Sequence, residues 1–274
     1  MLEDMTKILI EKALRQIITK HKMHKATLGN GNTDERENKF TRFMASDLDH
    51  CWPQVKTKFS KENYKNIDLV KFLPAAPIIR KPSNIIGSAP HVAWGLEAKH
   101  YDPYQDPELT VYLNKSLYGP ITDLLKLIDC RFKKCYILQL QTEIIDIKIP
   151  KSSNETRLAN AFPFLNYMRK TKQSSQDKIK RVTDQDRIPE LVKFSRNTLD
   201  SNLIYDSMPG LVKDTAGEVE VMIHYLISGP FYRNVLVNRL DGQGYLPGQS
   251  YETQAKIGNK VLQTNLHIES DHEE

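Results

Sequence analysis

Cysteine is scarce in this chain, and long apolar runs are missing. The 274 residues include three cysteines, which are Cys51, Cys130 and Cys135. An odd and sparse set of cysteines cannot form a disulfide framework, which indicates a reducing compartment. No apolar run approaches the roughly 20 residues that a membrane-spanning helix needs. We therefore expect an intracellular protein, cytoplasmic or nuclear, that has no transmembrane segment and is soluble or peripheral to a membrane.

The motifs of several enzyme and cofactor classes are also missing. The sequence has no Gly-x-Ser-x-Gly nucleophile elbow and no Gly-x-x-x-x-Gly-Lys phosphate loop. Residues 242–244 read Gly-Gln-Gly, but they lack the third glycine and the following helix of a dinucleotide site. Cys130 and Cys135 have no second ligand pair at a fitting distance. His21 and His24 have no acid or cysteine placed to complete a tetrahedral zinc site. The sequence thus predicts neither a zinc site nor an organic cofactor.

The charge balance is mildly basic. The formal net charge is +5 at pH 7, and the sequence pI is about 8.9. Such a balance favours a polyanion or an anionic membrane surface as partner where the positive charge is clustered. A chain of this length can bury a core without metal or disulfide crosslinks, so its apolar pattern should show how that core is built.

The segment 131–150 has the clearest two-residue period in the chain. Tyr136, Leu138 and Leu140 alternate with polar residues, which predicts a half-buried strand. The phase changes at Ile144 and Ile145, after which the odd-numbered positions are apolar. Two consecutive apolar residues at a phase change indicate either a β-bulge or a strand that changes the face it buries.

The remaining elements are predicted from apolar spacing and from the positions of proline and glycine. Helices are expected over residues 2–25, 33–50, 60–74, 120–128, 156–168 and 186–199. Strands are expected over residues 109–113, 219–223, 235–237, 251–257 and 261–268. The first helix has a basic face, so it is either docked on the protein, or bound to a membrane surface, or a targeting segment.

Six prolines between residues 74 and 107 predict an irregular connection. We therefore predict an α+β fold with a helical N-terminal lobe (residues 1–75) and a proline-spaced connection (76–107). A mixed, then antiparallel β-rich lobe follows (108–268), and residues 269–274 form an acidic tail.

One local pattern points to metal chemistry. Many metal-dependent nucleases hold an acid-x-lysine pair on one face of a strand, where the acid helps to bind a divalent metal. The lysine steadies the attacking water or the developing charge. Asp146 and Lys148 fit this pattern, with Asp129 or Glu143 as the further carboxylate and a glutamate of an N-terminal helix to complete the site. Mg²⁺ or Mn²⁺ is implied only under this hypothesis, and the alternative is the solvated face of an edge strand.

The segment 169–181 is the most basic stretch, with Asp177 as its single acid. Tyr167, just before it, is placed to stack on bases. A loop of this kind neutralises phosphates, although it is also compatible with an ordinary solvated loop. The candidate nucleic-acid contacts are Arg169, Lys170, Lys172, Lys178, Lys180, Arg181 and Tyr167.

Three functional hypotheses follow from these patterns. The first is a non-enzymatic binding or structural protein whose basic surfaces engage an anionic partner, nucleic acid (RNA or DNA) before lipid. The second is a peripheral structural protein of matrix type, as in a virion, that coats an anionic membrane and forms homo-oligomers through β edges. The third is the metal-dependent nuclease built on Asp146 and Lys148.

Overall fold

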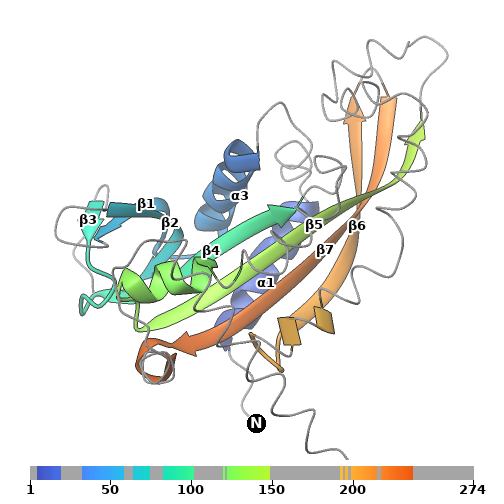
Figure 1. The fold of residues 1–274 in the computed structure, drawn as a ribbon. Coiled ribbons are helices and arrows are strands. Elements are labelled where there is room, and N and C mark those ends of the chain that lie inside the picture. The colour runs from blue at the N-terminus through green and yellow to red at the C-terminus, as the bar shows by residue number, and fades with distance from the viewer. Residues whose placement is uncertain are drawn as a thin grey trace, which may run out of the picture.

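A computed structural model describes ten stretches of the chain, and two helices begin it (Figure 1). The described residues are 5–19, 33–58, 64–74, 83–101, 120, 122–148, 192–193, 195–196, 199–214 and 217–236. The helices α1 (Met5–Thr19) and α3 (Thr33–Asp47) precede the strands. The strands are β1 (Cys51–Lys58), β2 (Tyr64–Phe72), β3 (Ser83–Ile85), β4 (Val92–Tyr101), β5 (Lys134–Lys148), β6 (Ile204–Asp214) and β7 (Gly217–Tyr232). A further helix at residues 122–129, called the crossover helix below, lies between β4 and β5.

The seven strands form one mixed sheet in the order β3-β1-β2-β4-β5-β7-β6. β4 and β5 are parallel, as are β1 and β3, while the other neighbours are antiparallel. Two adjacent parallel strands need a long crossover connection, and the crossover helix is part of it. Helices together with a mixed sheet confirm the α+β class. The predicted helical lobe, the predicted connection and the predicted β-rich lobe all contribute strands to this sheet. The N-terminal part is helical only as far as Asp47, because β1 begins at Cys51.

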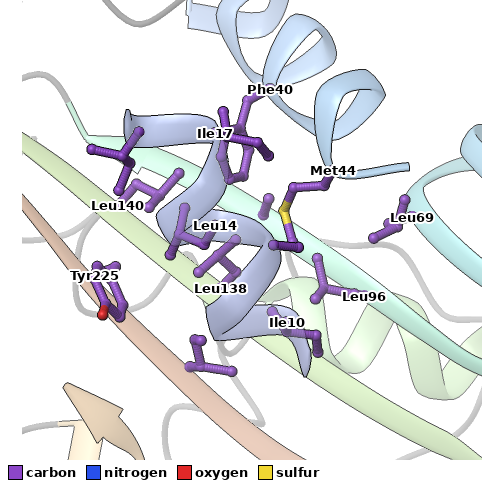
Figure 2. Close-up of a cluster of buried hydrophobic side chains, with 14 of the residues drawn as sticks. Ile10, Leu14, Ile17, Phe40, Met44, Leu69, Leu96, Leu138, Leu140 and Tyr225 are labelled. Atoms are coloured by element: carbon purple, nitrogen blue, oxygen red, sulfur yellow. The ribbon is translucent and has the colours of Figure 1, made fainter. Parts of the chain in front are cut away.

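One face of the sheet is covered by α1 and α3. Ile10, Leu14 and Ile17 of α1 lie in one buried cluster with Leu138 and Tyr225 of the sheet (Figure 2). These side chains recur at three- and four-residue steps, so they form one stripe along the helix. Burial of each such side chain contributes about 1.5–3 kcal/mol, which makes this stripe the main attachment of α1. The first helix is therefore docked on the sheet.

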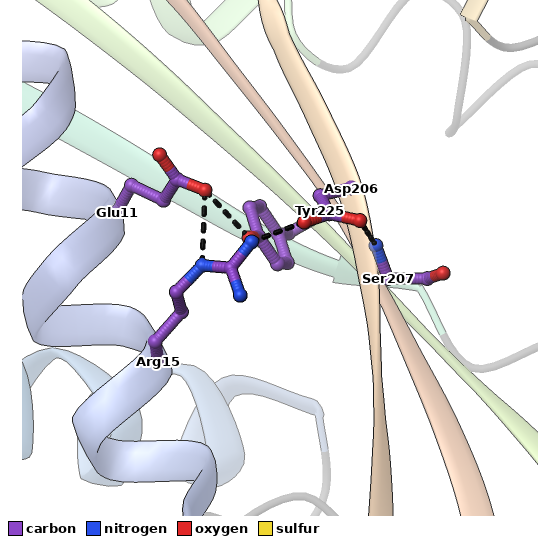
Figure 3. A network of polar contacts seen from close by, with 5 residues as sticks. All are labelled: Glu11, Arg15, Asp206, Ser207 and Tyr225. Atoms are coloured by element: carbon purple, nitrogen blue, oxygen red, sulfur yellow. Dashed lines mark hydrogen bonds and ion pairs between the residues drawn. The ribbon is translucent and has the colours of Figure 1, made fainter.

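A polar network at the edge of that stripe fixes the orientation of α1 (Figure 3). Arg15 Nε donates to Glu11 Oε1 over 3.0 Å, and Tyr225 Oη donates to the same oxygen over 2.8 Å. The Arg15 guanidinium also pairs with Asp206 of β6. Burial and the hydrogen bond to Glu11 raise the pKa of Tyr225, so its hydroxyl remains a donor at neutral pH. This network joins α1 to both β6 and β7.

The opposite face of the sheet carries the crossover helix. Leu127 and Ile128 of this helix share a second buried cluster with Phe132 and Ile137. Along β5, Ile137 belongs to this cluster, while its neighbours Tyr136 and Leu138 belong to the cluster under α1. Figure 1 shows α1 and the crossover helix on opposite sides of the central strands. The central sheet is thus covered on both faces.

The strand and the bulge that the alternation predicts in 131–150 are confirmed. β5 pairs with β7 along most of its length, and the register shifts between Ile144 and Asp146. The prediction that the strand is half-buried is wrong, because Gln139 and Gln141 are buried as well. Gln139 is buried together with Ser195, whose Oγ donates to Gln139 Oε1 over 3.0 Å.

The predicted helix over residues 60–74 is wrong, because this segment contains β2. Leu69 lies in the cluster under α1, whereas Ile67 and Val70 lie in the opposite cluster. A strand that is buried on both faces has a nearly continuous apolar run, which periodicity alone cannot distinguish from a helix.

Three further predictions need correction or remain open. β3 and β4 occupy part of the connection that was predicted to be irregular, and β4 lies between Pro90 and Pro103 without containing proline. β1 and β6 were not predicted, and Val235 lies in a helical turn instead of a strand. The elements predicted at 109–113, 156–168 and 251–268 lie outside the described residues.

Candidate active site

The predicted pair Asp146 and Lys148 lies at the far end of β5, on the surface. Lys148 Nζ is 3.9 Å from Asp146 Oδ2 and also pairs with Glu220 of β7. The two side chains are 52% and 57% exposed. Exposed ion pairs are screened by water and contribute little to stability. The local environment is that of a solvated strand pair.

The further carboxylates proposed for that pair are not assembled around it. Asp129 is buried in the crossover helix before β5 begins, whereas Asp146 is close to the last residue of β5. At about 3.3 Å per residue, the strand separates these two positions by roughly 40 Å. Glu143 lies on β5, but its side chain is outside the described set, as are residues 167–181, His21 and His24.

A second acid-x-lysine pair, Glu97-Ala98-Lys99, lies in the middle of the sheet on β4. Leu96 and Ala98 belong to the cluster under α1. Because side chains alternate along a strand, Glu97 and Lys99 face the other way, toward the crossover helix. Glu97 is 1% exposed, whereas the side chain of Lys99 is 33% exposed. The acid therefore lies deep in the protein, and the lysine reaches the surface.

Asp68 of the neighbouring strand β2 places a carboxylate beside this pair. The ladder between β2 and β4 ends at Leu69 and Leu96, so the N–H of Ala98 has no ladder partner from β2. Asp68 Oδ2 accepts a hydrogen bond from that N–H over 2.8 Å. Gln54, which has a left-handed φ of 51°, donates from Nε2 to Asp68 Oδ1 over 2.9 Å. Asp68 is thereby fixed next to the backbone between Glu97 and Lys99.

One side-chain oxygen of Glu97 is hydrogen-bonded, and the other has no partner among the described residues. Its Oε2 accepts a hydrogen bond from Lys126 Nζ of the crossover helix over 2.7 Å. Its Oε1 is buried and has no hydrogen-bond partner among the described residues. Burial, and then the negative charge of Asp68, raise the pKa of Glu97, while Lys126 opposes this change. An unsatisfied buried carboxylate oxygen is unfavourable unless a cation or a donor meets it.

Asp123 of the crossover helix faces the lysine of the pair. Its Oδ2 is 3.8 Å from Lys99 Nζ. Burial raises the pKa of Asp123 to about 6, and the positive charges of Lys99 and Lys126 oppose this rise. Asp68, Glu97 and Asp123 together carry three formal negative charges against the two positive charges of Lys99 and Lys126. A divalent cation would offset this excess of negative charge.

The donor set fits a catalytic cation better than a structural metal. Within the described part of the chain, no group of three or more His, Cys, Asp or Glu side chains could hold a metal ion. Mg²⁺ usually retains several waters and binds through one or two carboxylates together with substrate phosphates. Asp68 and Glu97 Oε1, with which no described residue forms a hydrogen bond, match that mode.

The described cysteines take no part in this site. Cys51, Cys130 and Cys135 are free and buried. Burial raises the pKa of Cys51 and of Cys130 to about 12, so both thiols stay protonated at neutral pH. Protonated and buried thiols are poor nucleophiles and poor metal ligands.

Comparisons of the chain with protein-family models, with curated proteins and with solved structures gave no match. Across the described residues, the helices are too short or too polar to cross a bilayer. The interpretation of the site therefore depends on its own geometry.

Sequence reasoning missed Asp68, Glu97 and Lys99. The signal was present as two charged residues at a spacing of two within the apolar segment VAWGLEAKHY, and as a single acid in NIDLVKF. Charged residues inside apolar strands are rarely fully buried unless they are paired, so their presence there favours a functional site.

Proposed function

We propose that the chain is a metal-dependent nuclease whose active site contains Asp68, Glu97 and Lys99. The observation that carries the proposal is the geometry around Ala98. Glu97 and Lys99 share one face of β4, and Asp68 binds the N–H between them. The Oε1 of Glu97, which has no hydrogen-bond partner in the described part of the chain, lies at this place. This is the arrangement of an acid-x-lysine pair with a further carboxylate from a preceding strand.

Each residue has a distinct role in phosphodiester hydrolysis. Asp68 and Glu97 would hold Mg²⁺ or Mn²⁺, which acts as a Lewis acid and lowers the pKa of a bound water. Lys99 places a positive charge where negative charge develops on the phosphate oxygens. The oxygen of water bonds to phosphorus, the bond from phosphorus to the leaving oxygen breaks, and that oxygen takes up a proton. The products are a phosphomonoester and an alcohol.

Two features support nucleic acid as the substrate class. The net charge of +5 favours a polyanion over an acidic partner. The basic segment 169–181 with Tyr167 remains a predicted contact for phosphates and bases. Nucleic acid is thus the partner that the sequence favours, and under this proposal it is also the substrate that is hydrolysed. The matrix-type hypothesis stays a prediction.

A cleavage assay with a matched pair of variants tests the proposal. Wild type, Asp68→Asn and Asp146→Asn are incubated with duplex DNA, single-stranded DNA and RNA, in Mg²⁺, in Mn²⁺ or in chelator. We expect metal-dependent cleavage by wild type and by Asp146→Asn, and at least a roughly 100-fold slower rate for Asp68→Asn. Both variants replace an aspartate with asparagine. Asp146→Asn therefore shows how much of the rate loss in Asp68→Asn comes from losing any one carboxylate.

Three results would contradict the proposal. They are no cleavage of any of these nucleic acids by wild type, cleavage that persists in chelator, and an undiminished rate in a folded Asp68→Asn variant. Thermal unfolding of each variant shows whether it is folded.

A further inference from the structure

The crossover helix presents two charges that are complementary to those of the acid-x-lysine pair. Asp123 and Lys126 lie three residues apart, so they share one face of the helix. Lys126 Nζ is 2.7 Å from Glu97 Oε2, and Lys99 Nζ is 3.8 Å from Asp123 Oδ2. Each residue of the strand pair thus meets an opposite charge from the helix.

The contact of Lys126 with Glu97 and the contact of Asp123 with Lys99 differ in their geometry. Lys126 occupies only one oxygen of Glu97, and no described residue forms a hydrogen bond with the other oxygen. The contact therefore orients the carboxylate without filling the position that a metal would take. The contact between Asp123 and Lys99 is an ion pair at 3.8 Å, in which Asp123 Oδ2 forms no hydrogen bond with a described residue. The side chain of Lys99 is 33% exposed, so its ammonium group is attracted to Asp123 at a place that solvent reaches.

We propose that Lys126 and Asp123 are positioning residues of the active site, with Lys126 orienting Glu97 toward the metal and Asp123 orienting Lys99 toward the phosphate. This inference rests on the proposed nuclease function. Neither residue touches the reacting atoms, so each acts through its partner on β4. The crossover helix is then part of the catalytic unit as well as the cover of this sheet face.

The two residues have separable effects under this inference. Loss of Lys126 releases a metal ligand, so the metal concentration for half-maximal activity rises, whereas the rate at saturating metal changes less. Loss of an outer partner of a metal ligand typically costs about 10–100-fold in metal affinity. Loss of Asp123 releases Lys99, so the saturated rate falls and the metal affinity changes little. A purely structural role would lower both quantities through loss of folded protein.

The experiment measures Mn²⁺ binding by titration calorimetry without nucleic acid, and the cleavage rate as a function of Mn²⁺ concentration. The variants are Lys126→Met, Lys126→Arg and Asp123→Asn. Matched controls make the same changes in the exposed pair, as Lys148→Met, Lys148→Arg and Asp146→Asn. We expect Lys126→Met to bind Mn²⁺ roughly 10–100-fold more weakly and Lys126→Arg to recover most of the affinity. The controls should match wild type. Lys126→Gln replaces Lys126→Met if the latter does not fold.

The outcomes separate this inference from the function on which it rests. Failure of wild type to bind Mn²⁺ and to cleave would overturn the proposed function. A wild type that binds and cleaves, with Lys126→Met binding Mn²⁺ as tightly or more tightly, would overturn the role of Lys126 alone. An unchanged saturated rate in Asp123→Asn would overturn the role of Asp123.

Discussion

The chain contains the same three-residue pattern in two very different environments. Glu97-Ala98-Lys99 lies on β4 in the middle of the sheet, and Asp146-Ile147-Lys148 lies near the end of β5. In both, an acid and a lysine lie two residues apart along a strand. Glu97 is buried beside Asp68 and meets Lys126. Asp146 and Lys148 are more than half exposed and share their surface with Glu220.

The difference shows that the neighbours of an acid-x-lysine pair determine its chemistry. Charges interact more strongly where water is excluded, so the buried pair responds to Asp68 and to the crossover helix. The pKa of Glu97 is raised by burial first and by Asp68 second. At the exposed pair, the hydrogen bond to Glu220 raises the pKa of Lys148, which only stabilises a charge that lysine already carries. Under the proposed function, a cation offsets the buried negative charge at the first pair, whereas water solvates the charges of the second.

The largest expected difference between the two pairs concerns catalysis. Replacing Lys99 with methionine removes the positive charge that, under the proposed function, faces the reacting phosphate. The cleavage rate at saturating Mg²⁺ should then fall by about 10²–10³-fold, as for the loss of a transition-state donor. Lys148→Met should leave the rate unchanged. Equal rate losses in the two folded variants would show that the pairs are equivalent.

The packing beneath the buried pair should give the next largest difference. Gly95 precedes Glu97 by two residues on β4, and a Cβ added there would lie 2.7 Å from Cδ1 of Phe132. Gly95→Ala should destabilise the protein by about 1–3 kcal/mol, because the ring must move within a packed core. The comparison is Ile145→Ala beside the exposed pair, where the side chain is 54% exposed. Urea unfolding measures both, and an equal loss in the two variants would contradict the difference in packing.

The pH dependence of stability should also distinguish the two pairs. The pKa of Asp123 is about 6 in the folded protein, against 3.8 for the unperturbed group. A folded state with the higher pKa binds more protons than the unfolded chain between these values, so stability falls as pH rises through them. From pH 5 to pH 7 this group should cost about 1 kcal/mol. Asp123→Asn should reduce the change in unfolding free energy, whereas Asp146→Asn should not. An identical pH profile in Asp123→Asn would contradict this assignment.

The smallest expected effect is on stability at the exposed pair. Asp146→Asn should change the free energy of unfolding by no more than about 0.5 kcal/mol, because exposed charges exchange one hydrated state for another. Urea unfolding at low and at moderate salt measures this change. A larger loss would show that the end of β5 has a structural role that its exposure does not reveal.

Part of the fold can be predicted from the sequence, because some elements bury the same face along their whole length and therefore have regularly spaced apolar residues. The alternation in 131–150 predicts β5 and its bulge, and the three- and four-residue spacing of apolar residues over 2–25 predicts α1. The apolar positions after Pro120 likewise predict the crossover helix. In each case, a contiguous segment carries its own periodic signal.

The site could not be predicted in the same way, because its members come from separate elements. Asp68 lies on a strand buried on both faces, whose apolar run has a spacing that also suits a helix. Glu97 and Lys99 lie on β4, which Pro90 and Pro103 flank. The high density of prolines in this part of the sequence instead favours an irregular segment. The pairing of Glu97 with Lys126 depends on the parallel crossover, which the spacing of apolar residues does not specify. The exposed pair on β5 was found instead because its strand had the clearest alternation.

Binding of Mn²⁺ to the purified chain, measured by titration calorimetry without nucleic acid, tests the central claim most directly. The proteins compared are wild type, Glu97→Gln and Asp146→Asn. The account predicts that wild type and Asp146→Asn bind Mn²⁺ equally, and that Glu97→Gln binds at least about tenfold more weakly while remaining folded. Absence of Mn²⁺ binding by wild type, or binding lost in Asp146→Asn and retained in Glu97→Gln, would contradict it.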